Sequence, residues 1–95
     1  MNPWVSAMTA FHENMLASVL CPNCSKDFLQ ARDLYSRLND TVKERVLSCP
    51  SCGASVAARM QADPNEERSG EISEALELSE ILYRRRLDQR REMSP

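Results

Sequence analysis

The sequence predicts a small, mostly helical α+β fold in which amphipathic helices flank a central β-hairpin. Three observations lead to this prediction: apolar residues recur at helical spacing near both ends, an alternating pattern occupies the middle, and the chain contains two Cys-Pro-x-Cys motifs. The chain has 95 residues, 2 glycines and 5% aromatic residues, a composition that favours helices over a turn-rich β-sandwich. Chains of this length bury little surface, so they often need a metal, crosslinks or a partner.

Residues 2–20 are predicted to form the N-terminal amphipathic helix. Asn2 can cap its start, and Pro3 suits the first helical position. The apolar stripe comprises Trp4, Val5, Met8, Phe11, Met15, Leu16, Val19 and Leu20. Packing in the core is the default interpretation of this stripe. Because it is large and rich in methionine, we also consider Trp4, Met8, Phe11 and Met15 as a surface for a protein partner or for self-association.

The middle of the chain is predicted to contain a further helix and then a hairpin. Phe28, Ala31, Leu34, Tyr35 and Leu38 recur at helical spacing within residues 27–39, although residues 27–30 could instead begin a short strand. Beyond the second cysteine pair, Ala54, Val56, Ala58 and Met60 alternate with polar or small residues. This period of two predicts a β-hairpin with the second cysteine pair at its tip. Thr41 and Glu44 also match a capping box, which would replace the approach strand by a short helix.

The predicted organisation divides the chain into three parts. Residues 1–60 hold the N-terminal helix and the hairpin, the polar residues 61–70 form a linker with Pro64 and Gly70, and residues 71–95 form a C-terminal amphipathic helix. Glutamates crowd the start of this last helix and arginines its end, which complements the helix dipole at both ends.

Two motifs, Cys21-Pro22-Asn23-Cys24 and Cys49-Pro50-Ser51-Cys52, carry the chemistry of the chain. Two residues between cysteines let one tight turn direct both sulfurs to a common point, so two such turns supply the four ligands of one closed tetrahedral Zn²⁺ site. Gly53, directly after the second motif, can take the positive φ that such a turn needs. A redox or iron–sulfur site and a disulfide framework are the alternatives. A thioredoxin-like site would need one Cys-x-x-Cys in a βαβ pattern, which the sequence lacks.

With these motifs, residues 19–60 resemble the zinc-ribbon proteins, in which two such turns close on a metal and the second sits at the end of a hairpin. The resemblance implies that Cys21, Cys24, Cys49 and Cys52 are structural ligands. Among ribbons, the sequence is loosely similar to the Com-type phage translational regulators, which act on RNA. It departs from them in its longer interval between the cysteine pairs and in its flanking helices.

Charge and composition exclude several classes of function. The net charge of −2 gives no global positive field for nucleic acid. The N-terminal segment lacks the basic start and apolar run of a secretory signal, and no stretch approaches the roughly 18 apolar residues of a membrane span. We therefore expect a cytoplasmic protein without a membrane interaction. Lacking a phosphate loop and any nucleophile–base set, it is expected to be no enzyme and to have no small-molecule substrate.

The arginines of the C-terminal segment form the one basic patch that could contact phosphates. They are Arg84, Arg85, Arg86, Arg90 and Arg91. Complementation of the helix dipole is the simpler interpretation. The sequence thus favours a non-enzymatic regulator or adaptor that acts mainly through protein contacts, with a nucleic-acid-binding regulator of transcription or translation as the alternative.

Overall fold

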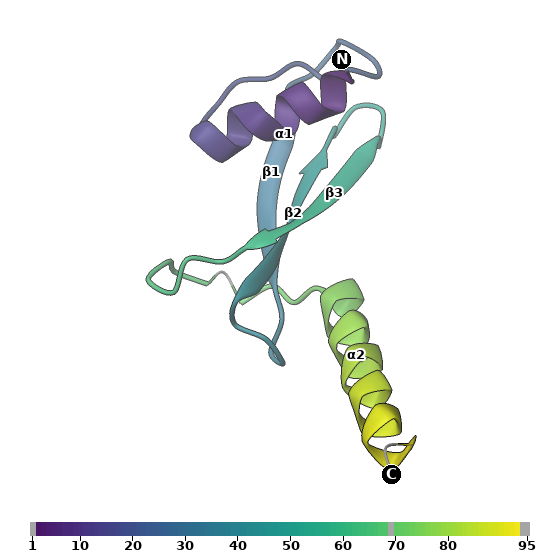
Figure 1. The fold of residues 1–95 in the computed structure, drawn as a ribbon. Coiled ribbons are helices and arrows are strands. Elements are labelled where there is room, and N and C mark those ends of the chain that lie inside the picture. Colours follow the sequence, from purple (N-terminus) through teal and green to yellow (C-terminus); the bar gives the residue numbers. More distant parts are fainter. Residues whose placement is uncertain (1, 69, 94–95) are drawn as a thin grey trace. The chain divides into compact units, whose positions relative to one another are not determined.

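The computed structural model describes residues 2–68 and 70–93, with side chains to residue 89. It contains two helices and three strands in the order α1, β1, β2, β3, α2 (Figure 1). The strands form one antiparallel sheet in the order β1-β2-β3. The prediction of a mostly helical fold is therefore wrong: the chain is a small α+β protein in which a sheet forms the middle of the sequence.

Helix α1 spans Pro3–Glu13 and begins as predicted, because the Asn2 side chain accepts a hydrogen bond from the Trp4 N–H at 2.9 Å. It ends seven residues before the predicted boundary at residue 20. The side chain of Asn14 accepts from the Leu16 N–H at 2.9 Å, which turns the chain away from the helix. Within α1, Ala7 and Phe11 are buried.

Strand β1 spans Gln30–Tyr35, so the helix predicted over residues 27–39 is replaced by a strand. Burial alternates along it, and Ala31, Asp33 and Tyr35 occupy the same side. Asp33 faces inward because it forms an ion pair with Arg45 of the next strand, at 2.8 Å. Because the inward residue Asp33 is charged, the sequence of β1 does not alternate between apolar and polar residues. Its apolar residues instead recur at the spacing of a helix.

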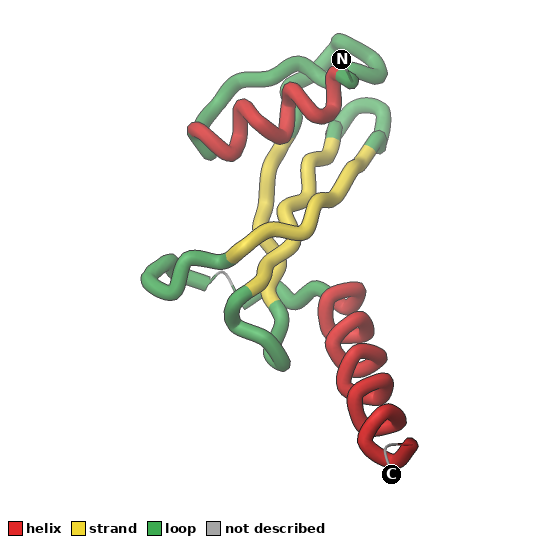
Figure 2. Tube along the Cα trace, in the orientation of Figure 1, coloured by secondary structure: helices red, strands yellow, loops and turns green. Residues whose placement is uncertain are grey.

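Strands β2, Val42–Ser48, and β3, Ser55–Gln61, form the predicted hairpin (Figure 2). The Cys49 N–H donates to the Ala54 carbonyl at 2.9 Å, and the Ala62 N–H donates to the Thr41 carbonyl at 2.9 Å. Both bonds belong to one register, so the pairing runs without a bulge from the tip to the far end. Thr41 precedes a strand, so the capping-box alternative does not form.

The chain falls into two compact units. The first lies within Met1–Asp33 and Arg45–Ala58, and the second within Leu34–Glu44 and Arg59–Pro95. The first unit contains a buried apolar cluster, to which the cysteines contribute: Ala7, Phe11, Cys21, Leu29, Leu47 and Cys49. The core of this unit is therefore continuous with the cysteine site.

The second unit contains a set of polar contacts around Glu66. Lys43 Nζ lies 2.8 Å from the Glu66 carboxylate, which also accepts from the Tyr35 hydroxyl at 2.8 Å. Ala62, Glu66 and Arg68, which belong to the predicted linker, thus make defined contacts. Helix α2 spans Glu74–Met93 and begins three residues later than predicted, where Ser73 Oγ accepts from the Leu76 N–H at 3.2 Å. Among the described residues, no helix is long and apolar enough to span a membrane.

Candidate metal centre

The first cysteine pair lies in a tight turn closed by its own backbone. The Ser25 N–H donates to the Cys21 carbonyl at 2.9 Å, and the Cys21 N–H donates to the Asp27 carbonyl at 2.8 Å. Ser25 takes a φ of 56°, in the left-handed region that few residues other than glycine adopt. An isolated antiparallel bridge between Leu20 and Phe28 closes the base of this turn. We call residues 21–25 the first knuckle.

The second knuckle, residues 49–53, lies at the tip of the β2–β3 hairpin. The Gly53 N–H donates to the Cys49 carbonyl at 3.0 Å, which matches the bond between Ser25 and Cys21. Gly53 has a φ of 75°, so the expectation that this glycine supplies a positive φ is confirmed. Ser25 and Gly53, which follow the two motifs, therefore both take a positive φ and close the same backbone hydrogen bond.

The two knuckles bring four sulfur atoms together. The ligand atoms of Cys21, Cys24, Cys49 and Cys52 all lie within 4.8 Å of one another. Sγ of Cys21 lies 3.7 Å from Sγ of Cys52, and the Cys24–Cys49 pair has the same separation. A tetrahedral ion with metal–sulfur bonds of about 2.3 Å places its ligands about 3.8 Å apart, so the spacing fits such an ion. All four cysteines are free thiols, which excludes the disulfide framework in this structure.

The four ligands differ in their exposure to solvent. Cys21 and Cys49, the first cysteine of each knuckle, are 0% and 2% exposed, and both belong to the core of the first unit. Cys24 is half-buried, and Cys52 is exposed. The site is therefore anchored in the core on one side and reaches the surface on the other.

Asn23 connects the two knuckles through their sulfurs. Its backbone N–H points to Cys21 Sγ, and its side-chain amide points to Cys52 Sγ, each at 3.4 Å. The Asn23 amide, together with the Ala54 backbone N–H, lowers the pKa of Cys52 to about 6. N–H groups that stabilise a thiolate are what a metal–thiolate site requires.

The pKa of Cys49 is shifted in the opposite direction, upward. The Cys52 backbone N–H acts to lower the pKa of Cys49, but burial and the neighbouring Cys52 and Cys24 thiols raise it to about 11. Sulfurs packed at 3.7 Å cannot all carry a negative charge unless a cation lies among them. The electrostatics of the cluster therefore favour a bound cation.

Asp27 is a second connection between the knuckles, and the sequence analysis missed it. One carboxylate oxygen accepts from the Phe28 N–H at 2.8 Å, and the other accepts from the Ser51 hydroxyl at 3.0 Å. The local bond is an ordinary use of an aspartate at a turn. Since Ser51 is far from Asp27 in the sequence, no local pattern indicates their contact.

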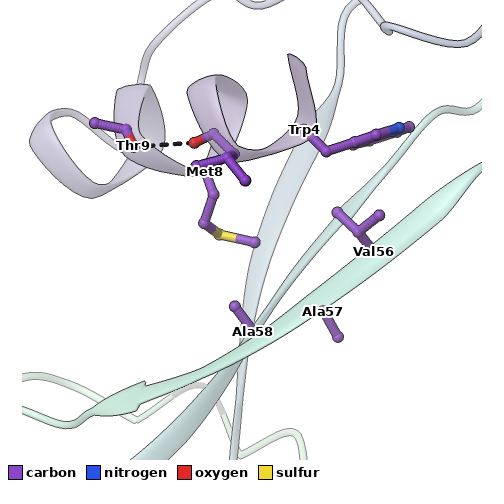
Figure 3. A pocket seen from close by; sticks show the side chains of 7 residues that line it. Trp4, Met8, Thr9, Val56, Ala57 and Ala58 are labelled. Carbon is purple, nitrogen blue, oxygen red and sulfur yellow. Dashed lines mark hydrogen bonds between the residues drawn. The ribbon is translucent and has the colours of Figure 1, made fainter. Parts of the chain in front are cut away.

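The apolar stripe of α1 faces the core of its own unit. Phe11 is 2% exposed, and Trp4 and Met8 pack against the core as half-buried residues. In Figure 3, Trp4 and Met8 extend from α1 toward Val56 and Ala58, and these residues line a pocket of about 280 Å³. Met15 lies beyond the end of α1 and is 42% exposed. The structure thus brings together three of the four proposed partner-binding residues, within the packing of the first unit.

The arginines proposed for phosphate binding are not equivalent. Arg84 donates to the Leu38 carbonyl at 2.9 Å and to Glu80 at 3.3 Å, so it is already engaged in the second unit. Arg85 and Arg86 are exposed. The side chains of Arg90 and Arg91 lie outside the described residues.

Comparisons with protein-family models, with curated proteins and with solved structures find no match to this chain. A proposal for the function therefore rests on the metal-binding geometry of the four cysteines.

Proposed function

We propose that this chain is a small zinc-ribbon regulator or adaptor, in which one structural Zn²⁺ holds the two knuckles together and protein contacts carry the function. The observation on which this proposal rests is the cluster of four cysteine sulfurs within 4.8 Å. Zinc is the metal that a set of four thiolates from two Cys-x-x-Cys turns most often binds. When bound, the ion would link the two knuckles, and its binding free energy would stabilise the folded state.

A structural role is favoured over a catalytic one by the ligand count. Catalytic zinc sites keep one position open for water or substrate, whereas four cysteines occupy every position of a tetrahedron. Cys21 and Cys49 are also core residues, packed in one cluster with Phe11 and Leu47. Because ligands and core share the same cluster, binding of the ion and folding of the first unit should be coupled.

Elemental analysis of the purified, reduced protein tests this proposal. We expect about one zinc per chain, and a large drop in melting temperature when a strong chelator removes it. A variant with all four cysteines replaced by serine is the matched control, and it should bind no zinc and show no response to the chelator. Iron in place of zinc, or a melting temperature that the chelator leaves unchanged, would contradict the proposal.

The role in protein contacts is supported by α2, on which aliphatic side chains are exposed. Leu78, Ile81 and Leu82 are 58%, 44% and 46% exposed. Exposed apolar side chains that cluster on one surface are typical of interaction sites in small soluble domains. This patch differs from the α1 stripe, whose central residue Phe11 is buried.

The alternative, a nucleic-acid-binding regulator, is favoured by the exposed guanidinium groups of Arg85 and Arg86. Phosphate contacts make affinity fall steeply with salt. If the alternative holds, the protein binds oligonucleotides at low salt, and replacing both arginines by glutamine lowers the slope of log affinity against log salt by about 2. Absence of binding at low salt would exclude this alternative.

A further inference from the structure

Contacts within the second unit fix which side of α2 faces inward. Leu76 is buried, and Glu77 accepts two bonds from the Arg37 guanidinium, at 2.7 and 2.9 Å. These bonds hold the pKa of the Glu77 carboxyl at about 2, so it stays charged at neutral pH. Further along, Arg84 donates to the Leu38 carbonyl at 2.9 Å. The inner face of α2 is therefore occupied by specific contacts over more than two turns.

Beside this inner face, α2 carries an exposed aliphatic face that runs from Ile81, about 40° around the helix from Glu77, to Leu82, about 140° from it. At 100° per residue, Leu78 lies about 160° from Leu76 and about 100° from Glu77, and Ile81 and Leu82 lie within about 60° of Leu78. Leu78, Ile81 and Leu82 are exposed, from 44% to 58%. We call these three residues the outer patch. Exposing this apolar surface to water is unfavourable in free energy, and contact with a second apolar surface would remove it from water.

Charges at the two ends of the outer patch indicate what covers it. Glu74 lies one turn before Leu78, and Arg85 lies one turn after Ile81. Both are exposed, and 11 residues of helix place them within about 20° of each other around the axis. The patch is thus bordered by an acid at one end and a base at the other, and both lie close to its centre line, within about 40° of Leu78.

We propose that the outer patch binds the outer patch of a second copy of this chain, with the two α2 helices antiparallel. In an antiparallel pair related by a two-fold axis, the centre line of the patch meets the same line of its partner in reverse order, so each Glu74 lies opposite Arg85 of the other copy. A parallel pair would align Arg85 with Arg85. Charge complementarity therefore selects both the occupant and the direction.

This inference rests on the proposed role in protein contacts and specifies the partner as the chain itself. Three aliphatic residues per copy form a small interface, so we expect a dimer that dissociates on dilution. The mass in solution, measured by sedimentation equilibrium from about 5 to about 500 μM, should rise from monomer to dimer. Leu78→Asp should raise the dissociation constant by on the order of tenfold or more.

Charge-reversal variants test the direction of pairing. Glu74→Arg alone and Arg85→Glu alone should each weaken the dimer by about tenfold, because each places like charges opposite one another. The double variant Glu74→Arg, Arg85→Glu should restore the dimer. Glu74→Arg with Arg86→Glu is the matched control, since Arg86 lies outside the outer patch, about 120° from Glu74 around the helix. This control should stay weak.

A protein that stays monomeric over the whole range overturns the inference, and so does a double variant that fails to recover. The zinc content and melting temperature of every variant are measured in parallel. A monomer that still binds one zinc would contradict the dimer and agree with the zinc proposal. A dimer that binds no zinc would contradict the zinc proposal and agree with the dimer.

Discussion

The two knuckles share the hydrogen bond that closes the turn, but they differ in the chain that supports them. In each, a backbone N–H after the second cysteine closes the turn onto the first cysteine, at 2.9 Å in the first knuckle and 3.0 Å in the second. The second knuckle continues directly into strands β2 and β3. The first is flanked by a single isolated bridge, between Leu20 and Phe28. The sequence motif thus builds the turn, and the surrounding chain decides how firmly the turn is held.

The position after the second cysteine shows the same contrast. Gly53 takes a φ of 75° without a steric cost, whereas Ser25 takes 56° with a Cβ in place. The hairpin therefore presents an unstrained turn, and the first knuckle carries backbone strain. Ligand removal, loss of the connecting bonds and exchange of the left-handed residues should each affect the two knuckles differently.

The largest expected effect comes from removing a buried ligand. Cys21→Ser replaces a ligand that is 0% exposed, so water cannot easily reach the vacated position, and a hydroxyl is left in the apolar core. We expect zinc affinity to fall on the order of a thousandfold, with loss of cooperative melting. Competition with a chromophoric chelator measures the affinity.

Cys52→Ser is the matched comparison from the second knuckle. Cys52 is exposed, so water can occupy the fourth position, and we expect a fall on the order of tenfold to a hundredfold. Equal losses in Cys21→Ser and Cys52→Ser would show that burial does not distinguish the ligands.

The next effect concerns the connection between the knuckles. Asp27→Ala removes the acceptor for both the Phe28 N–H and the Ser51 hydroxyl, so we expect the free energy of unfolding to fall by about 1.5 kcal/mol. Ser51→Ala removes one of these bonds, and the expected loss is about 0.5 kcal/mol. Chemical denaturation at saturating zinc measures both. A double variant that loses the sum of the two values would show that Asp27 and Ser51 do not interact.

Sequence reasoning succeeded where the determinants are local. Each cysteine pair and Gly53 lie within five residues, and the alternation of β3 repeats every two residues, so both could be predicted. It failed over residues 27–39, because the inward position of Asp33 depends on its ion pair with Arg45. The same limit applies to Asp27 and Ser51, which meet only when the knuckles converge.

Ser25 differs from these cases, because a comparison of the two motifs would have found it. Ser25 and Gly53 hold the same place after a Cys-Pro-x-Cys motif, so a positive φ at one implies a positive φ at the other.

A smaller effect is expected at Gly53. A Cβ built there meets no atom within 4 Å, so Gly53→Ala adds no clash and its cost comes from the positive φ alone. We expect the free energy of unfolding to fall by about 1 kcal/mol. Thermal and denaturant unfolding at saturating zinc measure the change. A neutral result would mean that the hairpin tip relaxes to a different backbone conformation.

The smallest effect, of opposite sign, is expected at the first knuckle. Ser25→Gly relieves the strain of a non-glycine residue at a φ of 56°, and the gain exceeds the added entropy of the unfolded chain. We expect the protein to gain about 0.5 kcal/mol. Lys26→Gly is the matched control: it lies in the same loop without a positive φ, so it should lose stability. If both variants lost stability equally, the first knuckle would carry no strain. The two knuckles would then differ only in the strands β2 and β3 that flank the second one.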